Sequence, residues 1–258
     1  MNIVWWSLVI ALAFNLLLFI PAWLFKTDKL TDLSYSLTFI LLVVFGFSQS
    51  AKSLGQTLIS IMVLLWALRL GGFLFIRVNK AGKDSRFDKL RSQFWPFLRF
   101  WFFQGLTVFI VMAAAIALYN EPDAPYTIWF YPGWLIFGLG LALEAVADYQ
   151  KYKFSQTNTK GSWIDIGFWR MSRHPNYLGE IMVWSGVYIF AVTNLHGVAR
   201  LLALASPIYI ALILLFFSGI PLLEKSADKK WGANKDYQDY KKQVPALVPN
   251  LKSLKRLD

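Results

Sequence analysis

The chain has 258 residues, of which 57% are hydrophobic and 16% are charged. An ordinary soluble domain is about 45–50% apolar and about 25% charged, so this composition excludes a typical soluble enzyme and indicates a membrane protein. The 45 aromatic residues exclude intrinsic disorder. There is no cysteine and there are two histidines, which argues against disulfides, thiolate chemistry and a metal centre.

Long apolar stretches follow one another along the whole chain. About 20 apolar residues of helix cross a hydrocarbon core about 30 Å thick, and charged or turn residues divide the sequence into seven such stretches. These are residues 3–25, 33–51, 56–76, 94–118, 128–147, 177–194 and 201–223. We therefore predict an all-α polytopic membrane protein, a bundle of about seven transmembrane helices.

The distribution of lysine and arginine predicts the orientation. With the N-terminus outside and the C-terminus cytoplasmic, the inner segments hold 22 of the 26 basic residues, and only Lys52 and Arg200 lie in outer loops. This arrangement accounts for most of the net charge of +11, so no nucleic-acid partner is needed. We expect a multi-pass protein of the bacterial inner membrane, folded as one integral membrane domain over residues 1–258.

Four charged residues, Arg69, Glu144, Asp148 and Glu180, fall within or at the ends of predicted spans. A charge at membrane depth costs at least about 2.5–3.5 kcal/mol, so each is a candidate site residue. Glu144 and Asp148 are four residues apart and share a helix face, and so do Asn176 and Glu180. The alternative is that these acids pair with nearby cations for structure alone.

The segment before the sixth span is rich in polar and basic residues. Pro175 suits the first turn of a helix, so that span is expected to begin there with its positive dipole end near Arg173. Such a helix end attracts phosphate. Alternatively, Arg170 and Arg173 are topology anchors.

The same segment carries a family resemblance. Residues 167–180, ending in Pro175-Asn176-Tyr177-Leu178-Gly179-Glu180, together with Asp148-Tyr149, Tyr237, Tyr240 and residues 244–249, resemble the membrane steroid 5α-reductases (3-oxo-5-alpha-steroid 4-dehydrogenases). The chain is more similar to a bacterial membrane branch that shares their C-terminal domain. Residues 66–70 and 82–87 look like that branch as well.

This resemblance implies an oxidoreductase that transfers hydride from NADPH to a carbon–carbon double bond conjugated with a carbonyl, in a lipophilic substrate such as a steroid or another lipid enone. It implies substrate-side helices in residues 1–93 and a cofactor-binding half in residues 94–258. Asp148, Asn176 and Glu180 fall on family positions that hold the dinucleotide, and Glu144 stands where the steroid enzymes carry Asn. The other candidate cofactor-binding residues are Arg86, Lys153, Arg173, Tyr177 and Tyr237.

The catalytic positions depart from the steroid enzymes. Those enzymes use a Glu in the second helix and a Tyr in the third, where this chain has Asp32 and Trp66. Asp32 keeps a carboxyl group, but an indole cannot supply a proton as a phenol does. Tyr35, one turn after Asp32, is the nearest phenol that could replace it.

Two other functions remain open. Arg173, His174, Pro175, Tyr177 and Gly179 also satisfy a string found in membrane methyltransferases of the isoprenylcysteine carboxyl methyltransferase type, which bind S-adenosylmethionine. A transporter or structural protein is the third possibility, although the charges gather at one side and not at the midplane. Gly138-Leu139-Gly140 lies within an apolar helix and predicts close helix packing, not a dinucleotide fingerprint.

Overall fold

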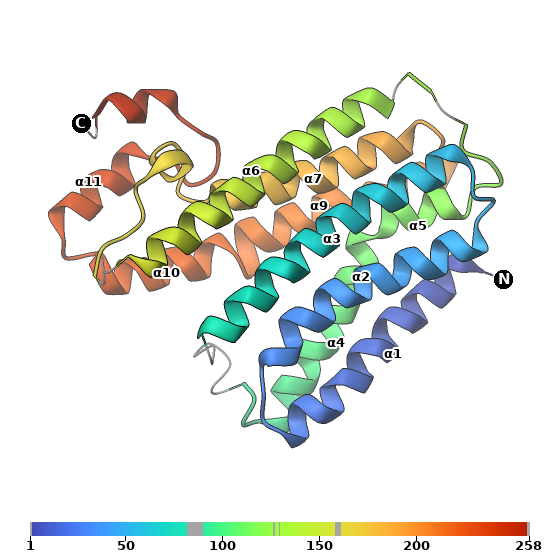
Figure 1. Ribbon diagram of the computed structural model, residues 1–258, viewed down its shortest axis with the longest axis horizontal. Helices are drawn as coiled ribbons and strands as arrows, with labels where there is room; N and C mark the ends of the chain where they lie inside the picture. The colour runs from blue at the N-terminus through green and yellow to red at the C-terminus, as the bar shows by residue number, and fades with distance from the viewer. Residues whose placement is uncertain (1, 82–89, 126, 129, 158–160, 257–258) are drawn as a thin grey trace. The chain divides into compact units, whose positions relative to one another are not determined.

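The structure is a computed structural model that describes residues 2–81, 90–125, 127–128, 130–157 and 161–256 (Figure 1). The described part is helical and contains no strand, which confirms the all-α prediction. The helices are α1 (Ile3–Leu24), α2 (Lys29–Gln49), α3 (Leu54–Ala81), α4 (Phe94–Val111), α5 (Ala113–Tyr119), α6 (Phe130–Gln156), α7 (Pro175–Val192), α8 (Gly197–Ala203), α9 (Ala205–Leu212), α10 (Ile220–Trp231) and α11 (Lys235–Gln243). Short 3₁₀ helices cover Gly167–Arg170 and Leu251–Arg256, and a π-helical turn covers Ile213–Phe217.

Six helical segments of the described residues are long and apolar enough to cross a membrane, where the sequence predicted seven. They are Ile3–Leu24, Lys29–Gln49, Leu54–Ile76, Phe94–Val111, Phe130–Gln156 and Gly197–Trp231. The predicted stretch 177–194 does form α7, but the helix begins at Pro175 and includes Asn176 and Glu180, which lower its apolar character. The protein is thus an integral multi-pass membrane protein, and its orientation and its bacterial inner-membrane location stay predictions.

Contacts between residues group the chain into two compact units. Unit 1 comprises Met1–Gly133 and Val187–Ser206, and unit 2 comprises Trp134–Gly186 and Pro207–Asp258. The single-domain prediction and the division at residue 93 stay predictions.

In unit 1, α1 packs against α4 and α2 packs against α3. Buried amides and hydroxyls join three of these helices, because polar groups at membrane depth must bond to one another. Gln104 Nε2 donates to Asn15 Oδ1 at 2.9 Å and to Ser34 Oγ at 2.7 Å. Asn15 Nδ2 donates in turn to Thr38 Oγ1 at 3.0 Å. This network fixes the register of α1, α2 and α4.

In unit 2, α6 and α7 approach each other at two glycines. A Cβ on Gly140 would lie 2.7 Å from the Gly179 carbonyl oxygen, and a Cβ on Gly179 would lie 2.7 Å from the Glu144 backbone nitrogen. The predicted close packing is therefore right for Gly140. It is wrong for Gly138, where a Cβ would meet no atom of the described residues within 4 Å.

Candidate functional site

The close approach of α6 and α7 brings two predicted site residues together. Asn176 Nδ2 donates a hydrogen bond to Asp148 Oδ1 at 3.2 Å. The Asp148 side chain is buried, as is Glu144 one turn earlier on α6, and Glu180 is half-buried on α7. A half-buried amide and a buried carboxylate thus face each other across two helices whose spacing the small glycines permit.

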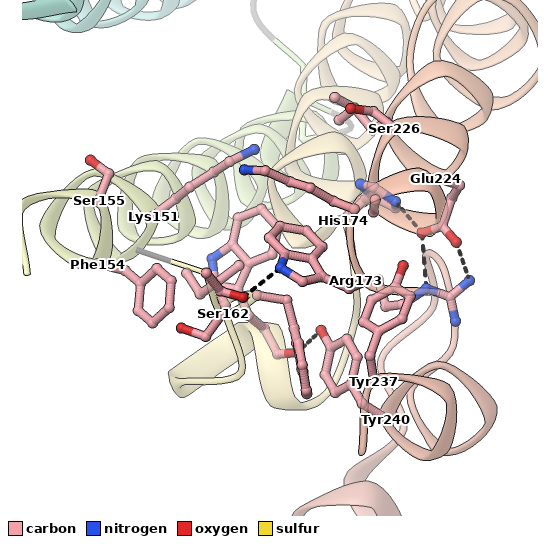
Figure 2. Close-up of a pocket in the computed structure, with 18 of the residues that line it drawn as sticks. Lys151, Phe154, Ser155, Ser162, Arg173, His174, Glu224, Ser226, Tyr237 and Tyr240 are labelled. Carbon is pink, nitrogen blue, oxygen red and sulfur yellow. Dashed lines mark hydrogen bonds and ion pairs between the residues drawn. The ribbon is translucent and has the colours of Figure 1, made fainter. Parts of the chain in front are cut away.

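Unit 2 also contains a cavity of about 490 Å³. Its walls come from the end of α6, from residues 161–174 and from α10 and α11 (Figure 2). Aromatic side chains form much of the lining, namely Phe154, Trp163, Trp169, Trp231, Tyr237 and Tyr240. This cavity lies within the size range of small-molecule sites.

Hydrogen bonds and ring contacts fix these aromatic walls. Tyr240 donates its hydroxyl to the Trp169 carbonyl at 2.8 Å, and Trp169 Nε1 donates to the Ala147 carbonyl at 3.1 Å. The ring centroids of Trp163 and Tyr237 lie 5.3 Å apart. Segments distant in sequence therefore present flat faces to one cavity.

The ionisable residues of the lining make it positive. Lys151, Arg173 and Lys230 are cations, and Glu224 is the one carboxylate among the described lining residues. The Lys151 ammonium lies 5.1 Å from the ring centroid of Trp169, and the Lys230 ammonium lies 5.0 Å from that of Trp231. A cavity with flat aromatic walls and excess positive charge suits an anion that carries a planar ring.

Glu224 on α10, which sequence reasoning missed, is the centre of an ion cluster. Its two oxygens accept from Arg173 Nε at 3.0 Å and Nη2 at 3.2 Å. His174 Nε2 lies 2.9 Å from the same carboxylate, and Lys241 Nζ lies 3.2 Å from it. The one sequence signal was position, because Glu224 is the first charged residue after the apolar stretch 201–223.

Arg173 uses its remaining donors to hold the C-terminal segment. Its Nη1 donates to the carbonyls of Lys241 at 2.7 Å and Val244 at 2.6 Å, and its backbone nitrogen donates to the Pro245 carbonyl at 2.9 Å. Asn250 extends this docking through a backbone hydrogen bond to the Met171 carbonyl at 2.9 Å. The bonding of Arg173 favours a structural clamp, and its role in phosphate binding stays a prediction.

His174 lies immediately before α7 and lines the cavity. Burial lowers the pKa of its imidazole below the ordinary value of 6.5, and the hydrogen bond to Glu224 opposes that shift. Its Nδ1 is buried without a hydrogen-bond partner in the described part of the chain. Since a carboxylate only accepts hydrogen bonds, Nε2 carries the proton and Nδ1 is an acceptor.

The other predicted cofactor residues have different surroundings. The Tyr177 ring stacks on His174 with centroids 5.6 Å apart. Tyr237 is buried in the cavity wall, where burial raises the pKa of its phenol, and Lys153 is exposed on α6. Arg86 lies outside the described residues.

The predicted catalytic residues lie in unit 1. Asp32 and Tyr35 are half-buried on α2, and Trp66 is fully buried on α3. The Trp66 ring contacts Phe39 with centroids 4.8 Å apart and Tyr35 with centroids 6.5 Å apart. The structure therefore brings Tyr35 and Trp66 together in an aromatic cluster, and their catalytic roles stay predictions.

No group of three or more metal-binding side chains occurs among the residues that the structure describes.

An uncharacterized protein of Schizosaccharomyces pombe is 21% identical to the chain over 277 aligned positions, which cover 92% of the chain and 76% of that protein. No solved structure matches the chain with significance. Residues 18–244 match the family described as "Protein of unknown function (DUF1295)", a family associated with steroid 5α-reductase-like proteins. Because this match covers most of the sequence, the chain belongs to the DUF1295 family.

Proposed function

We propose that the protein is a membrane oxidoreductase that transfers hydride from NADPH to a conjugated carbon–carbon double bond of a lipophilic substrate, such as a steroid-like molecule or another lipid enone. The observation that carries the proposal is the hydrogen-bonded pair of Asp148 and Asn176. Lys151 follows Asp148 by less than one turn of α6, and His174 precedes Asn176 by two residues, so the pair adjoins the cavity in sequence.

The chemistry of these groups fits a phosphorylated dinucleotide. A carboxylate accepts hydrogen bonds from ribose hydroxyls, and an amide both donates to and accepts from a carboxamide. The aromatic cavity with Lys151 and Lys230 suits a base and its phosphates. When bound, NADPH supplies the hydride, and Asp32 and Tyr35 are the candidates for moving the proton that completes the reduction.

A second candidate function is S-adenosylmethionine-dependent methyl transfer. It is favoured by one observation, the position of His174 in the cavity wall. There the imidazole is held by a hydrogen bond between its Nε2 and a Glu224 carboxylate oxygen 2.9 Å away. The same aromatic walls can bind a sulfonium cation. The positive charge of the lining opposes that ligand, so we place the reductase first.

Thermal unfolding of the detergent-purified protein separates the two functions. A ligand that binds the folded state raises the unfolding temperature, and the rise grows with ligand concentration above Kd. We expect NADPH to raise the unfolding temperature and S-adenosylmethionine to leave the unfolding temperature unchanged. NADH, which lacks the additional phosphate of NADPH, is the control for the contribution of that phosphate. Stabilisation by S-adenosylmethionine and by neither nicotinamide nucleotide would overturn the reductase.

A further inference from the structure

Helix α10 presents different groups around its circumference. One face carries Glu224 and Asp228, which pair with Lys241 at 3.2 and 2.6 Å. A second face, including Leu223 and Ala227, lines the cavity. The first face is occupied by ion pairs and the second faces the cavity, so the remaining face is the one that points away from both.

That remaining face carries Leu222, Lys225 and Lys229. Their spacing of three and four residues places them on one side of the helix. All three side chains are exposed, Leu222 to 57%. Neither Lys225 nor Lys229 has an ion-pair or hydrogen-bond partner in the described part of the chain. The acid next to Lys229 along the helix, Asp228, is already paired with Lys241 at 2.6 Å.

The face lies where the last apolar segment ends. α10 completes the membrane-spanning stretch Gly197–Trp231, in which no charge occurs between Arg200 and Glu224. Phe216, Phe217 and Leu222 are exposed large apolar side chains just before the lysines. Lipid headgroups lie at the boundary between hydrocarbon and water, and a lysine there extends its ammonium to the phosphate level.

Several neighbouring lysines are already engaged. Lys241 pairs with Glu224 and Asp228, and Lys242 lies 3.6 Å from Asp239. Lys230 lies over the Trp231 ring. Lys225 and Lys229 differ from these three in having no such neighbour, so their charge is available to an external anion.

We propose that Lys225 and Lys229 form a binding site for the headgroup phosphate of an anionic glycerophospholipid, whose acyl chains lie against Leu222 and the apolar surface before it. The charge complementarity selects an anionic over a zwitterionic lipid, because a neutral headgroup cancels the attraction to the phosphate. This site is independent of the reductase chemistry and uses none of its proposed residues.

The test compares lipid binding to the whole protein, purified in a neutral detergent and delipidated. Native mass spectrometry measures adducts with phosphatidylglycerol and with phosphatidylcholine of the same acyl chains. We expect the wild type to prefer phosphatidylglycerol. The double variant Lys225→Gln/Lys229→Gln should lose roughly thirtyfold in phosphatidylglycerol affinity at low salt and keep its phosphatidylcholine affinity.

The matched control is Lys235→Gln/Lys252→Gln, which removes the same charge from two other exposed positions of unit 2. It should keep the wild-type preference. An equal loss in the control would show diffuse charge in place of a site. A wild type without preference, an unaffected Lys225→Gln/Lys229→Gln variant, or displacement of the lipid by inorganic phosphate would each overturn the proposal. Equal unfolding temperatures of all variants establish that folding is intact.

Discussion

The imidazole Nε2 of His174 lies 2.9 Å from a carboxylate oxygen of Glu224, fifty residues later in the chain. The contact joins the start of α7 to α10 at one wall of the aromatic cavity. Arg173 and Lys241 bond to the same carboxylate, so a single acid connects α7, α10 and α11. The wall of the cavity that these three helices share therefore depends on the Glu224 carboxylate.

Replacing Glu224 by Gln should destabilise the protein. Its side chain is 17% exposed, and its loss leaves the Arg173 cation without its carboxylate partner and Lys241 with Asp228 alone. We expect the free energy of unfolding to fall by about 1–3 kcal/mol, less than for a fully buried pair. Thermal unfolding in detergent measures it. Asp239→Asn, which breaks an exposed pair with Lys242, is the control and should have little effect; equal stability of the two variants would refute the central role of Glu224.

His174 should make stability depend on pH. Its folded-state pKa is lowered by burial from 6.5, so the folded protein binds fewer protons than the unfolded chain. The stability contributed by neutral His174 is therefore complete above the unfolded pKa and is lost as the pH falls through and below that value. Unfolding temperatures of wild type and His174→Phe, measured between about pH 8 and about pH 5, should converge toward the acid end. His196→Gln, at an exposed histidine, should keep the wild-type pH profile, and a parallel profile in His174→Phe would contradict the assignment.

Two glycines of α6 provide a direct test of helix packing. A methyl group on Gly140 would lie 2.7 Å from atoms of α7, whereas one on Gly138 would have no neighbour within 4 Å in the part of the chain that the structure describes. Gly140→Ala should lower the free energy of unfolding by about 1–3 kcal/mol through overpacking. Gly138→Ala should be neutral or stabilise by up to about 1 kcal/mol, since alanine favours the helix. Equal unfolding temperatures of the two variants would show that α6 and α7 are not in close contact at Gly140.

Much of the fold could be predicted because apolar length alone determines membrane helices. All six spanning segments begin within about five residues of their predicted starts, an ordinary boundary error. The predicted stretch 177–194 became a more polar helix because α7 also carries Asn176 and Glu180. Asp148 and Asn176 were expected to lie near each other because the family resemblance assigns both to the dinucleotide site, but their hydrogen bond was not predicted.

The ion cluster and the cavity could not be predicted in the same way. Helical periodicity reports which residues share a face of one helix, but it does not report which helix lies opposite. Glu224, His174 and Lys241 come from three separate segments, and the cavity aromatics come from four. Trp66 shows the same limit, because its burial against Phe39 and Tyr35 depends on the packing of α2 on α3.

The cofactor proposal predicts a specific pattern of NADPH affinities. Asp148→Ala and Asn176→Ala each remove a group that would bond to the dinucleotide, and one hydrogen bond involving a charged group contributes about 1.5–3 kcal/mol. Each variant should therefore weaken NADPH binding roughly tenfold to a hundredfold, and Glu180→Ala should weaken it in the same direction. Asn194→Ala, which removes a buried asparagine from unit 1, controls for the general effect of losing a buried amide and should keep the wild-type affinity. Isothermal titration of the folded variants with NADPH gives the dissociation constants.

Because Asp148 and Asn176 bond to each other, the double variant should lose less binding free energy than the sum of the two single losses. Wild-type affinity in both single variants would remove the pair from the cofactor site.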